Sequence, residues 1–310
     1  MEFFHKVPRI PFMAQRRFCY VLSIAMIAAS IAAIAIKGLN LAVDFTGGVV
    51  MEASYPAAAD LERTRTALAQ AGYADAQVQN FGSSRDVMVR LGPQHTETSN
   101  ELSTRIAAVL ATVSSGIEIR RTEFVGPQVG KELLFKGVEA MAITLLLILI
   151  YIAFRFRWKF GIGAVLATLH DPFVTIGVFA MFRIPFDLSI LAAVLAVIGY
   201  SLNETVVVFD RVRERFHTLR KSEPVEVFDI AINETLSRTV ITKLATLIVV
   251  VALYLLGGEA LRGFGLALII GILVVTYSSM YVASGVALDL GVTRRDLMPS
   301  ERRTPVDDMP

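Results

Sequence analysis

The sequence holds one cysteine, one tryptophan and four histidines among its 310 residues. A single cysteine, Cys19, cannot form a disulfide within the chain. It lies at the start of an apolar run, which favours a packing role. Bulk charge is also missing, because 30 basic and 28 acidic residues leave a net charge of +2. A chain this close to neutral gives no support for binding to nucleic acid or to another bulk polyanion.

Apolar residues are what the sequence has in excess. Hydrophobic residues make up 54% of the chain, and the mean hydropathy is +0.58. The excess is concentrated in long runs, which is typical of membrane-spanning helices. The runs that we expect to span a membrane are 18–36, 134–154, 160–182, 188–209, 236–256 and 264–288.

The first run has two interpretations. It follows a short basic tail, 1–17, and ends near Ala33-Ile34-Ala35, so it resembles the three regions of a cleaved signal peptide. However, the run is longer than the usual apolar core of a signal peptide, and more apolar runs follow it. We therefore interpret 18–36 as a retained signal-anchor helix.

The one long polar region, 37–133, has the pattern of an α+β domain. We expect strands at 49–55, 77–81, 86–91 and 117–125 and amphipathic helices at 58–71 and 98–113. The order βαββαβ is that of a ferredoxin-like sandwich. The region contains no cluster of metal ligands, no catalytic triad and no phosphate-binding loop in its sequence. We expect a binding or mechanical role for it, not an enzymatic one, with no metal and no cofactor.

Basic residues predict the orientation. They gather in the tail 1–17, in the loop 155–159, in the predicted loop 210–235 and in the tail 289–310, whereas the short loops on the other side hold about one each. Cytoplasmic loops of membrane proteins carry the excess of Lys and Arg. Both termini are therefore expected in the cytoplasm, with the polar domain across the membrane.

Glu204 lies inside the apolar run 188–209, roughly 24 Å from its outer end at about 1.5 Å per residue. A carboxylate at that depth costs several kcal/mol unless it is paired, hydrated or protonated, so it marks a functional site. Arg238, near the inner start of the run 236–256, lies at a similar depth and can pair with it. Lys243 is about one and a half turns further out.

A second pair of ionisable residues, His170 and Asp171, lies near the middle of the run 160–182, before Pro172. One hypothesis is a proton or ion path in which Glu204, Arg238 and Asp171 take part and Asn203 hydrates the path. The alternative is static: an interhelical pair that fixes packing, or charged groups that reach the inner interface. For Asn203 taken singly, a hydrogen bond between helices explains the residue equally well.

Several stretches resemble the SecF family of protein translocase subunits, within the RND transporter superfamily. They are Val43-Asp44-Phe45-Thr46-Gly47-Gly48, Val125-Gly126-Pro127-Gln128-Val129-Gly130, His170-Asp171-Pro172, the stretch from Ile198 to Glu214 that includes Asp210, Leu236-Ser237-Arg238-Thr239, Tyr254-Leu255-Leu256-Gly257-Gly258 and Ser278-Ser279-Met280-Tyr281-Val282-Ala283-Ser284. The similarity runs in order along nearly the whole chain, but not into the tails.

The resemblance implies a function that periodicity does not show. Members of this family work with SecD as an obligate partner and use the proton-motive force in the late, SecA- and ATP-independent stage of export through the SecYEG channel. It also implies SecA, YajC and YidC as partners, the translocating unfolded polypeptide as the cargo, and the bacterial inner membrane as the location. The proposed proton-responsive residues of the family fall on Glu204 and Arg238. The family often has Asp at the first of these positions, so Glu204 adds one methylene of reach.

Two other functions remain open at this point. The chain fits a non-energised scaffold or assembly factor of the translocase, in which the outer domain holds the polypeptide and the buried charges only pack. It also fits half of an RND-type exporter of small molecules, although a single small outer domain argues against that function. No feature of the sequence predicts an enzyme.

Overall fold

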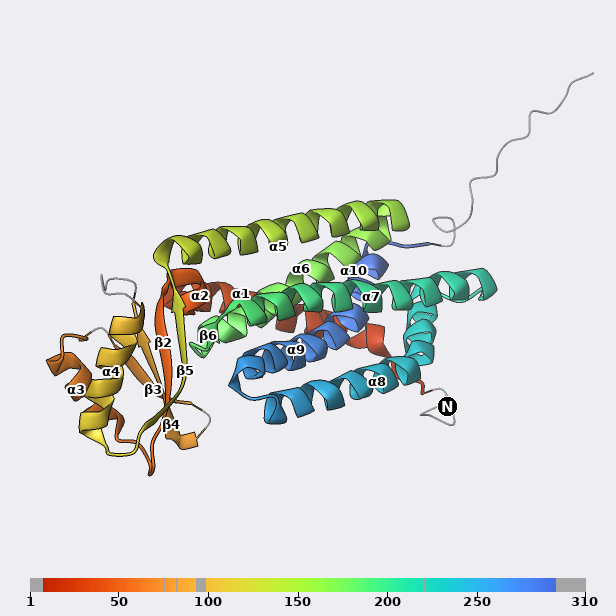
Figure 1. The fold of residues 1–310 in the computed structure, drawn as a ribbon. Helices are drawn as coiled ribbons and strands as arrows, with labels where there is room; N and C mark the ends of the chain where they lie inside the picture. The colour runs from red at the N-terminus through yellow and green to blue at the C-terminus, as the bar shows by residue number, and fades with distance from the viewer. Residues whose placement is uncertain (1–7, 75, 82, 93–98, 220, 294–310) are drawn as a thin grey trace, which may run out of the picture.

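The computed structural model describes residues 8–74, 76–81, 83–92, 99–219 and 221–293. It has two parts, an elongated bundle of long helices and an α/β domain at one end of the bundle (Figure 1). The outer portions of both predicted tails, 1–7 and 294–310, lie outside the described residues.

Six helices in the described part of the chain are long and apolar enough to cross a membrane, which confirms this part of the expected fold class. The first consists of a short 3-10 helix, η1 (Phe12–Gln15), and α1 (Arg16–Lys37). The others are α5 (Pro127–Arg155), α6 (Trp158–Met181), α7 (Leu188–Thr218), α8 (Pro224–Leu256) and α9 (Glu259–Ser278), and α9 continues through a π-helical turn, η2 (Ser279–Ala283), into α10 (Ser284–Asp289).

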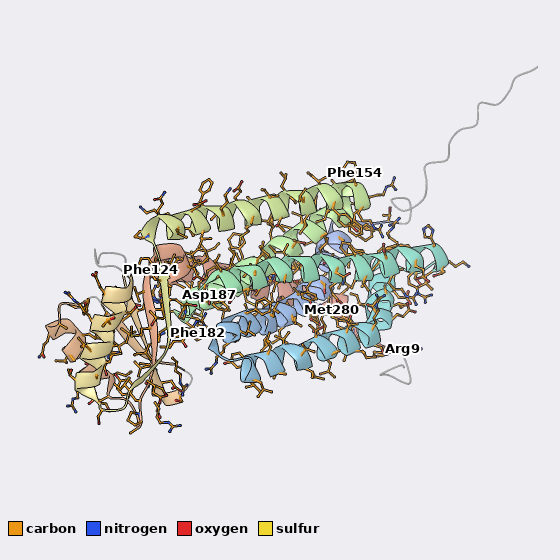
Figure 2. The ribbon with its side chains drawn as sticks, in the orientation of Figure 1. Arg9, Phe124, Phe154, Phe182, Asp187 and Met280 are labelled. Atoms are coloured by element: carbon orange, nitrogen blue, oxygen red, sulfur yellow. The ribbon has the colours of Figure 1, made fainter. Side chains whose placement is uncertain are left out.

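Burial divides these helices into two groups. More than half of the most apolar stretch of α6 and α9, and half of that of α7, is buried, so these helices form the centre of the bundle, whereas α1, α5 and α8 bury much less. Along the spans, most of their remaining surface is apolar. Phe154 of α5, for example, is 89% exposed and points away from the other helices (Figure 2). Surfaces of this kind suit contact with lipid or with another membrane subunit.

The helices extend beyond the apolar runs that predict them. The expected loop 210–235 is mostly helical, because α7 continues to Thr218 and α8 begins at Pro224. Similarly, α5 begins at Pro127, before the predicted span 134–154. Hydropathy reports where a helix lies in apolar surroundings, while Arg, Glu and Lys are themselves good helix formers. The apolar run therefore predicts the depth of a span better than the ends of its helix.

The α/β domain has the expected βαββαβ order. Its elements are β2 (Gly48–Ser54), α3 (Leu61–Gln70), β3 (Gln77–Phe81), β4 (Ser83–Leu91), α4 (Ser99–Val113) and β5 (Glu118–Val125). The sheet is antiparallel with the order β3-β4-β2-β5. This order is that of a ferredoxin-like sandwich, with both helices on one face of the sheet (Figure 1).

The core of this domain lies between the sheet and its two helices. Alternate residues of β2 and β4 point into it, as the twofold repeat of a strand requires. The helices contribute side chains at three- and four-residue spacing, as an amphipathic helix does. The most buried members are Val49, Met51, Val87, Val89 and Leu91 from the strands and Leu68, Leu102, Ile106 and Leu110 from the helices.

Two glycines form the root of the domain, where the chain enters it and leaves it. Gly47 and Gly48 have φ of +73° and +125°, a region that favours glycine. A Cβ at Gly47 would lie 2.7 Å from the Cα of Pro127, the first residue of α5. One at Gly48 would lie 2.1 Å from the carbonyl oxygen of Leu91. These glycines let the first strand pass close to α5 and to β4.

The root is also joined to the bundle by a small second sheet. β1 (Asn40–Leu41) pairs in parallel with β6 (Pro185–Phe186), which lies in the turn between α6 and α7. The one-turn helix α2 (Val43–Thr46) follows β1 and packs against α5. The start of the α/β domain, which we call the outer domain, is therefore attached to the outer ends of three spans.

Candidate functional site

Glu204 lies on the side of α7 that faces α8, and it is 6% exposed. Two residues of α8 contact its carboxylate. The Thr239 hydroxyl donates a hydrogen bond to Oε1 at 2.6 Å, and Lys243 Nζ lies 3.3 Å from Oε2. Thr239 and Lys243 are four residues apart, so they share one face of α8. The carboxylate is thus held between a hydroxyl and an ammonium group, inside the membrane-spanning part of the chain.

The predicted pairing of Glu204 with Arg238 is wrong for this structure. Arg238 is exposed, and the ion-pair partner of Glu204 among the described residues is Lys243. Depth along the membrane places Arg238 near Glu204, but it does not say on which face of α8 the side chain lies. Successive residues of a helix point about 100° apart, so neighbours in the sequence lie on different faces. Thr239 faces α7, so Arg238 lies to one side of that contact. Asn203 is likewise on the exposed surface of α7, next to Glu204.

Asp171 belongs to a second polar cluster, in the interior of the bundle. It is completely buried, and His170 is 2% exposed. The Ser278 hydroxyl of α9 donates to Asp171 Oδ2 at 2.8 Å, and His170 Nδ1 lies 2.9 Å from Oδ1. Among the described residues no Lys or Arg pairs with Asp171. The structure therefore places one carboxylate against a cation and the other among neutral or titratable donors.

Asp210 joins α7 to α5 near the inner end of the bundle. Arg155 Nη2 lies 2.5 Å from both carboxylate oxygens, and Arg213 Nη1 lies 3.7 Å from one of them. The three side chains are partly exposed, so the pairs contribute little to stability. These ion pairs join α7 to α5, two helices that otherwise share few contacts.

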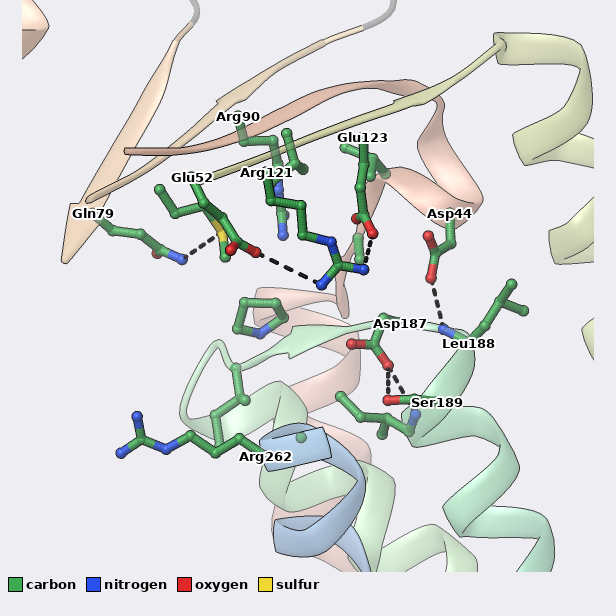
Figure 3. Close-up of a pocket in the computed structure, with 18 of the residues that line it drawn as sticks. Asp44, Glu52, Gln79, Arg90, Arg121, Glu123, Asp187, Leu188, Ser189 and Arg262 are labelled. Carbon is green, nitrogen blue, oxygen red and sulfur yellow. Dashed lines mark hydrogen bonds and ion pairs between the residues drawn. The ribbon is translucent and has the colours of Figure 1, made fainter. Parts of the chain in front are cut away.

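Asp44, another motif residue, links the outer domain to α7. Its Oδ2 accepts a hydrogen bond from the backbone N–H of Leu188, the first residue of α7, at 3.0 Å (Figure 3). Asp187 caps the same helix, because its Oδ1 accepts from the N–H of Ile190 at 2.8 Å. The first N–H groups of a helix lack partners within the helix. The two aspartates therefore provide acceptors for two of the free N–H groups at the outer end of α7.

Replacing Asp44 with alanine is expected to destabilise the chain by about 1 kcal/mol, because one N–H of α7 then loses its acceptor. Asp44→Asn keeps an acceptor oxygen and should retain most of the stability. Thermal unfolding of the purified chain in detergent measures both. An equal loss in the two variants would contradict this account, since it would assign the effect to the charge of Asp44.

An outer cleft of about 540 Å³ separates the open face of the domain's sheet from the bundle. Figure 3 shows charged side chains from both sides of it, including Arg90, Arg121 and Glu123 from the sheet and Asp187 from the turn before α7. Burial lowers the pKa of the Arg90 guanidinium, while the nearby Asp187 and Asp44 act to raise it. Residues on either side of the root, among them Asp44 and Val50, line the cleft, so a change in the angle of the domain would alter its width.

Sequence reasoning identified Glu204, His170 and Asp171 but assigned no functional role to Thr239 and Ser278. A signal for Thr239 was present, because Thr239 and Lys243 repeat at the four-residue spacing of one helix face. No such spacing points to the role of Ser278, since its partner lies 107 residues away. Among the described residues, no group of three or more His, Cys, Asp or Glu side chains is arranged to hold a metal ion.

Two family models match the chain. Residues 105–293 match the model described as protein export membrane protein SecD/SecF, C-terminal, and residues 32–55 match the SecD/SecF GG motif. The second match covers Gly47 and Gly48, which form the root of the outer domain.

Curated relatives match over nearly full length. The protein translocase subunit SecF of Vibrio alginolyticus is 48% identical over 94% of this chain and 93% of its own length. That of Pseudomonas aeruginosa is 43% identical over 98% of this chain and 99% of its own length. The SecF of Escherichia coli O157:H7 is 40% identical over 96% of this chain and 93% of its own length.

A solved structure has a similar fold. The crystal structure of SecDF from Thermus thermophilus, a translocon-associated membrane protein, superposes with a TM-score of 0.82 at 36% identity over 91% of this chain. A SecDF structure in a super-membrane-facing form superposes with a TM-score of 0.68. The present chain spans 39% of the length of either solved chain.

Proposed function

The chain belongs to the SecF family of protein translocase subunits, and from this we propose that it works with SecD to convert the proton-motive force into the late, SecA- and ATP-independent stage of protein export. The observation that carries this proposal is the buried carboxylate of Glu204 in a membrane-spanning helix. Such a group is costly to bury and is usually kept for a task. A protonatable group between two helices can couple the arrival of a proton to their relative position.

The coupling step follows from the contacts of Glu204. In its ionised form it accepts a hydrogen bond from Thr239 and pairs with Lys243, so it holds α8 against α7. Protonation removes the charge that attracts Lys243 and weakens both contacts. The ammonium group is then buried without a counter-charge, which is a costly state. Movement of α8 relative to α7 relieves that cost.

The outer domain receives this movement through α7. The helix is continuous from Leu188 to Thr218, so a shift near Glu204 is transmitted along its length. Its outer end binds Asp44 and follows the strand pair of β1 and β6, which attaches to the root of the domain. A small tilt at the root changes the width of the outer cleft. We assign the outer domain the role of engaging the emerging polypeptide as the cleft changes.

A SecD partner is supported by what lies exposed beside Glu204. Arg238 and Asn203 are polar residues on the surface of spans, at the depth of the buried pair. An exposed guanidinium facing hydrocarbon is unfavourable, so a second membrane subunit is expected to cover this surface. By the positive-inside rule, both termini lie in the cytoplasm and the α/β domain lies outside the inner membrane. SecYEG, SecA, YajC and YidC follow only from the family resemblance.

The test is release of a late export intermediate from membranes with and without a proton gradient. We expect Glu204→Gln, assembled with SecD, to lose the gradient-dependent part of release, because the amide cannot take up a proton. Glu204→Asp keeps the carboxylate and should retain most of it. Gradient-dependent release that is unchanged in Glu204→Gln would reject the motor function. It would support the non-energised scaffold, in which the same pair only packs.

A further inference from the structure

Four buried polar atoms on α6 and α7 have no hydrogen-bond partner among the described residues. The side chains that carry them are 2% exposed or less. A buried hydroxyl without a partner costs about 1–3 kcal/mol, so such atoms are uncommon unless something else satisfies them. The atoms are Thr168 Oγ1 and His170 Nε2 on α6 and Ser201 Oγ and Thr205 Oγ1 on α7.

Helix geometry places the two hydroxyls of α7 between the two buried carboxylates. α6 and α7 are antiparallel, and Gly163 of α6 contacts Phe209 of α7. Moving four residues outward along each helix brings Ala167 level with Thr205, and four more bring Asp171 level with Ser201. Ser201 and Thr205 share the buried face of α7, and Glu204 follows on the same turn towards α8. The hydroxyls therefore lie in one layer, with Asp171 on one side and Glu204 on the other.

The third helix of the centre closes this layer. α9 runs parallel to α7, since a Cβ at Gly263 would meet Ile190 and one at Gly271 would meet Val197, one turn before Ser201. Its Ser278 reaches the layer and donates to Asp171. Directly after Ser278 the helix takes up the π-helical turn η2, with the Ser284 hydroxyl donating to the carbonyl of Ser279 at 3.0 Å. Such turns are rare and occur frequently at functional sites.

We propose that water bound by Ser201 and Thr205 joins Asp171 to Glu204 in a proton relay across the centre of the bundle. A buried water makes about three hydrogen bonds to groups that are otherwise unsatisfied, and this layer supplies such groups on two facing helices. This inference rests on the proposed function, because it assumes that Glu204 exchanges a proton. It adds a route for that proton and gives the Ser201 and Thr205 hydroxyls a role in the transfer.

The transfer balances without any other reactant. A protonated Asp171 gives its proton to a bound water, each water or hydroxyl passes on one of its own, and Glu204 gains one. Only O–H bonds form and break. His170, through Nδ1, is placed to exchange a proton with Asp171. Among the described residues, Lys243 of α8 faces Glu204 and also lies over the ring of Tyr200, and Tyr277 of α9 lies against His170.

The decisive variant removes both hydroxyls and keeps the shape of the layer: Ser201→Ala with Thr205→Val. We expect gradient-dependent release by the variant assembled with SecD to fall about tenfold, with normal assembly. Thr205→Ser keeps a hydroxyl and should behave as the unsubstituted chain does. The matched control is Thr175→Val with Thr235→Val. These hydroxyls are also buried, but each donates to a carbonyl of its own helix, so their loss should leave release unchanged.

Each other outcome has a defined meaning. Unchanged release by the double variant, with loss in Glu204→Gln, would overturn the relay and leave the motor function standing. Unchanged release by Glu204→Gln would overturn the motor function itself. A loss of the same size in Thr205→Ser would also overturn the relay, because packing and not the hydroxyl would explain it. If the double variant does not accumulate, Ser201→Ala and Thr205→Val are measured singly, and normal release by both rejects the relay.

Discussion

Replacing Gly48 with alanine is expected to prevent stable folding of the outer domain. The residue has φ of +125°, and a Cβ there would lie 2.1 Å from the carbonyl oxygen of Leu91. The neighbouring atom is backbone, and it belongs to the strand pair in which Val49 lies opposite Leu91. Relief therefore requires β2 to separate from β4. Strain at φ costs about 1–3 kcal/mol, and overpacking about 1–3 kcal/mol more.

The measurement is limited proteolysis of the full chain in detergent. The signal is the rate at which cuts appear within the outer domain. Gly126→Ala is the matched control, because Gly126 lies at the other entrance to the root with nothing within 4 Å of an added Cβ and with φ of −64°. It should resist the protease as the unsubstituted chain does. Equal resistance of Gly48→Ala would show that the close approach at the root is not needed.

The fold was predictable because each of its signals is local. Long apolar runs identify spans, and alternating or amphipathic stretches identify the strands and helices of the outer domain. Glu204 was predictable for the same reason, since its cost depends only on the apolar run around it. The root was visible as a pair of glycines, but its purpose was not. The close approach of Gly47 to Pro127 joins residues far apart in the chain.

The partner of Glu204 was not predictable from depth alone. Arg238 and Lys243 both lie near its level, and choosing between them requires the rotation of α8 about its own axis. That rotation is set by packing against α7 and α9 along the whole helix, for example where Gly265 meets Tyr254. The sequence of α8 does not predict this rotation, because its own apolar residues occupy all sides of the helix.

Replacing Lys243 with methionine is expected to destabilise the chain by about 3–5 kcal/mol, because the carboxylate of Glu204 is then buried without a counter-charge. The long apolar side chain of methionine fills much of the same space, so lost packing contributes little. Arg238→Met is the matched control, since Arg238 is exposed on the same helix, and it should change stability far less. Thermal unfolding of the detergent-solubilised chain measures both.

The double variant Glu204→Gln with Lys243→Met separates stability from function. Removing both charges at once leaves neither group buried alone, so the double variant should unfold close to the unsubstituted chain, and the two single losses should not add. Gradient-dependent release should nevertheless stay absent, because no proton acceptor remains between α7 and α8. A double variant that regains release would show that the pair only packs the helices. If Arg238→Met were instead the destabilising change, the partner of Glu204 would be Arg238 and not Lys243.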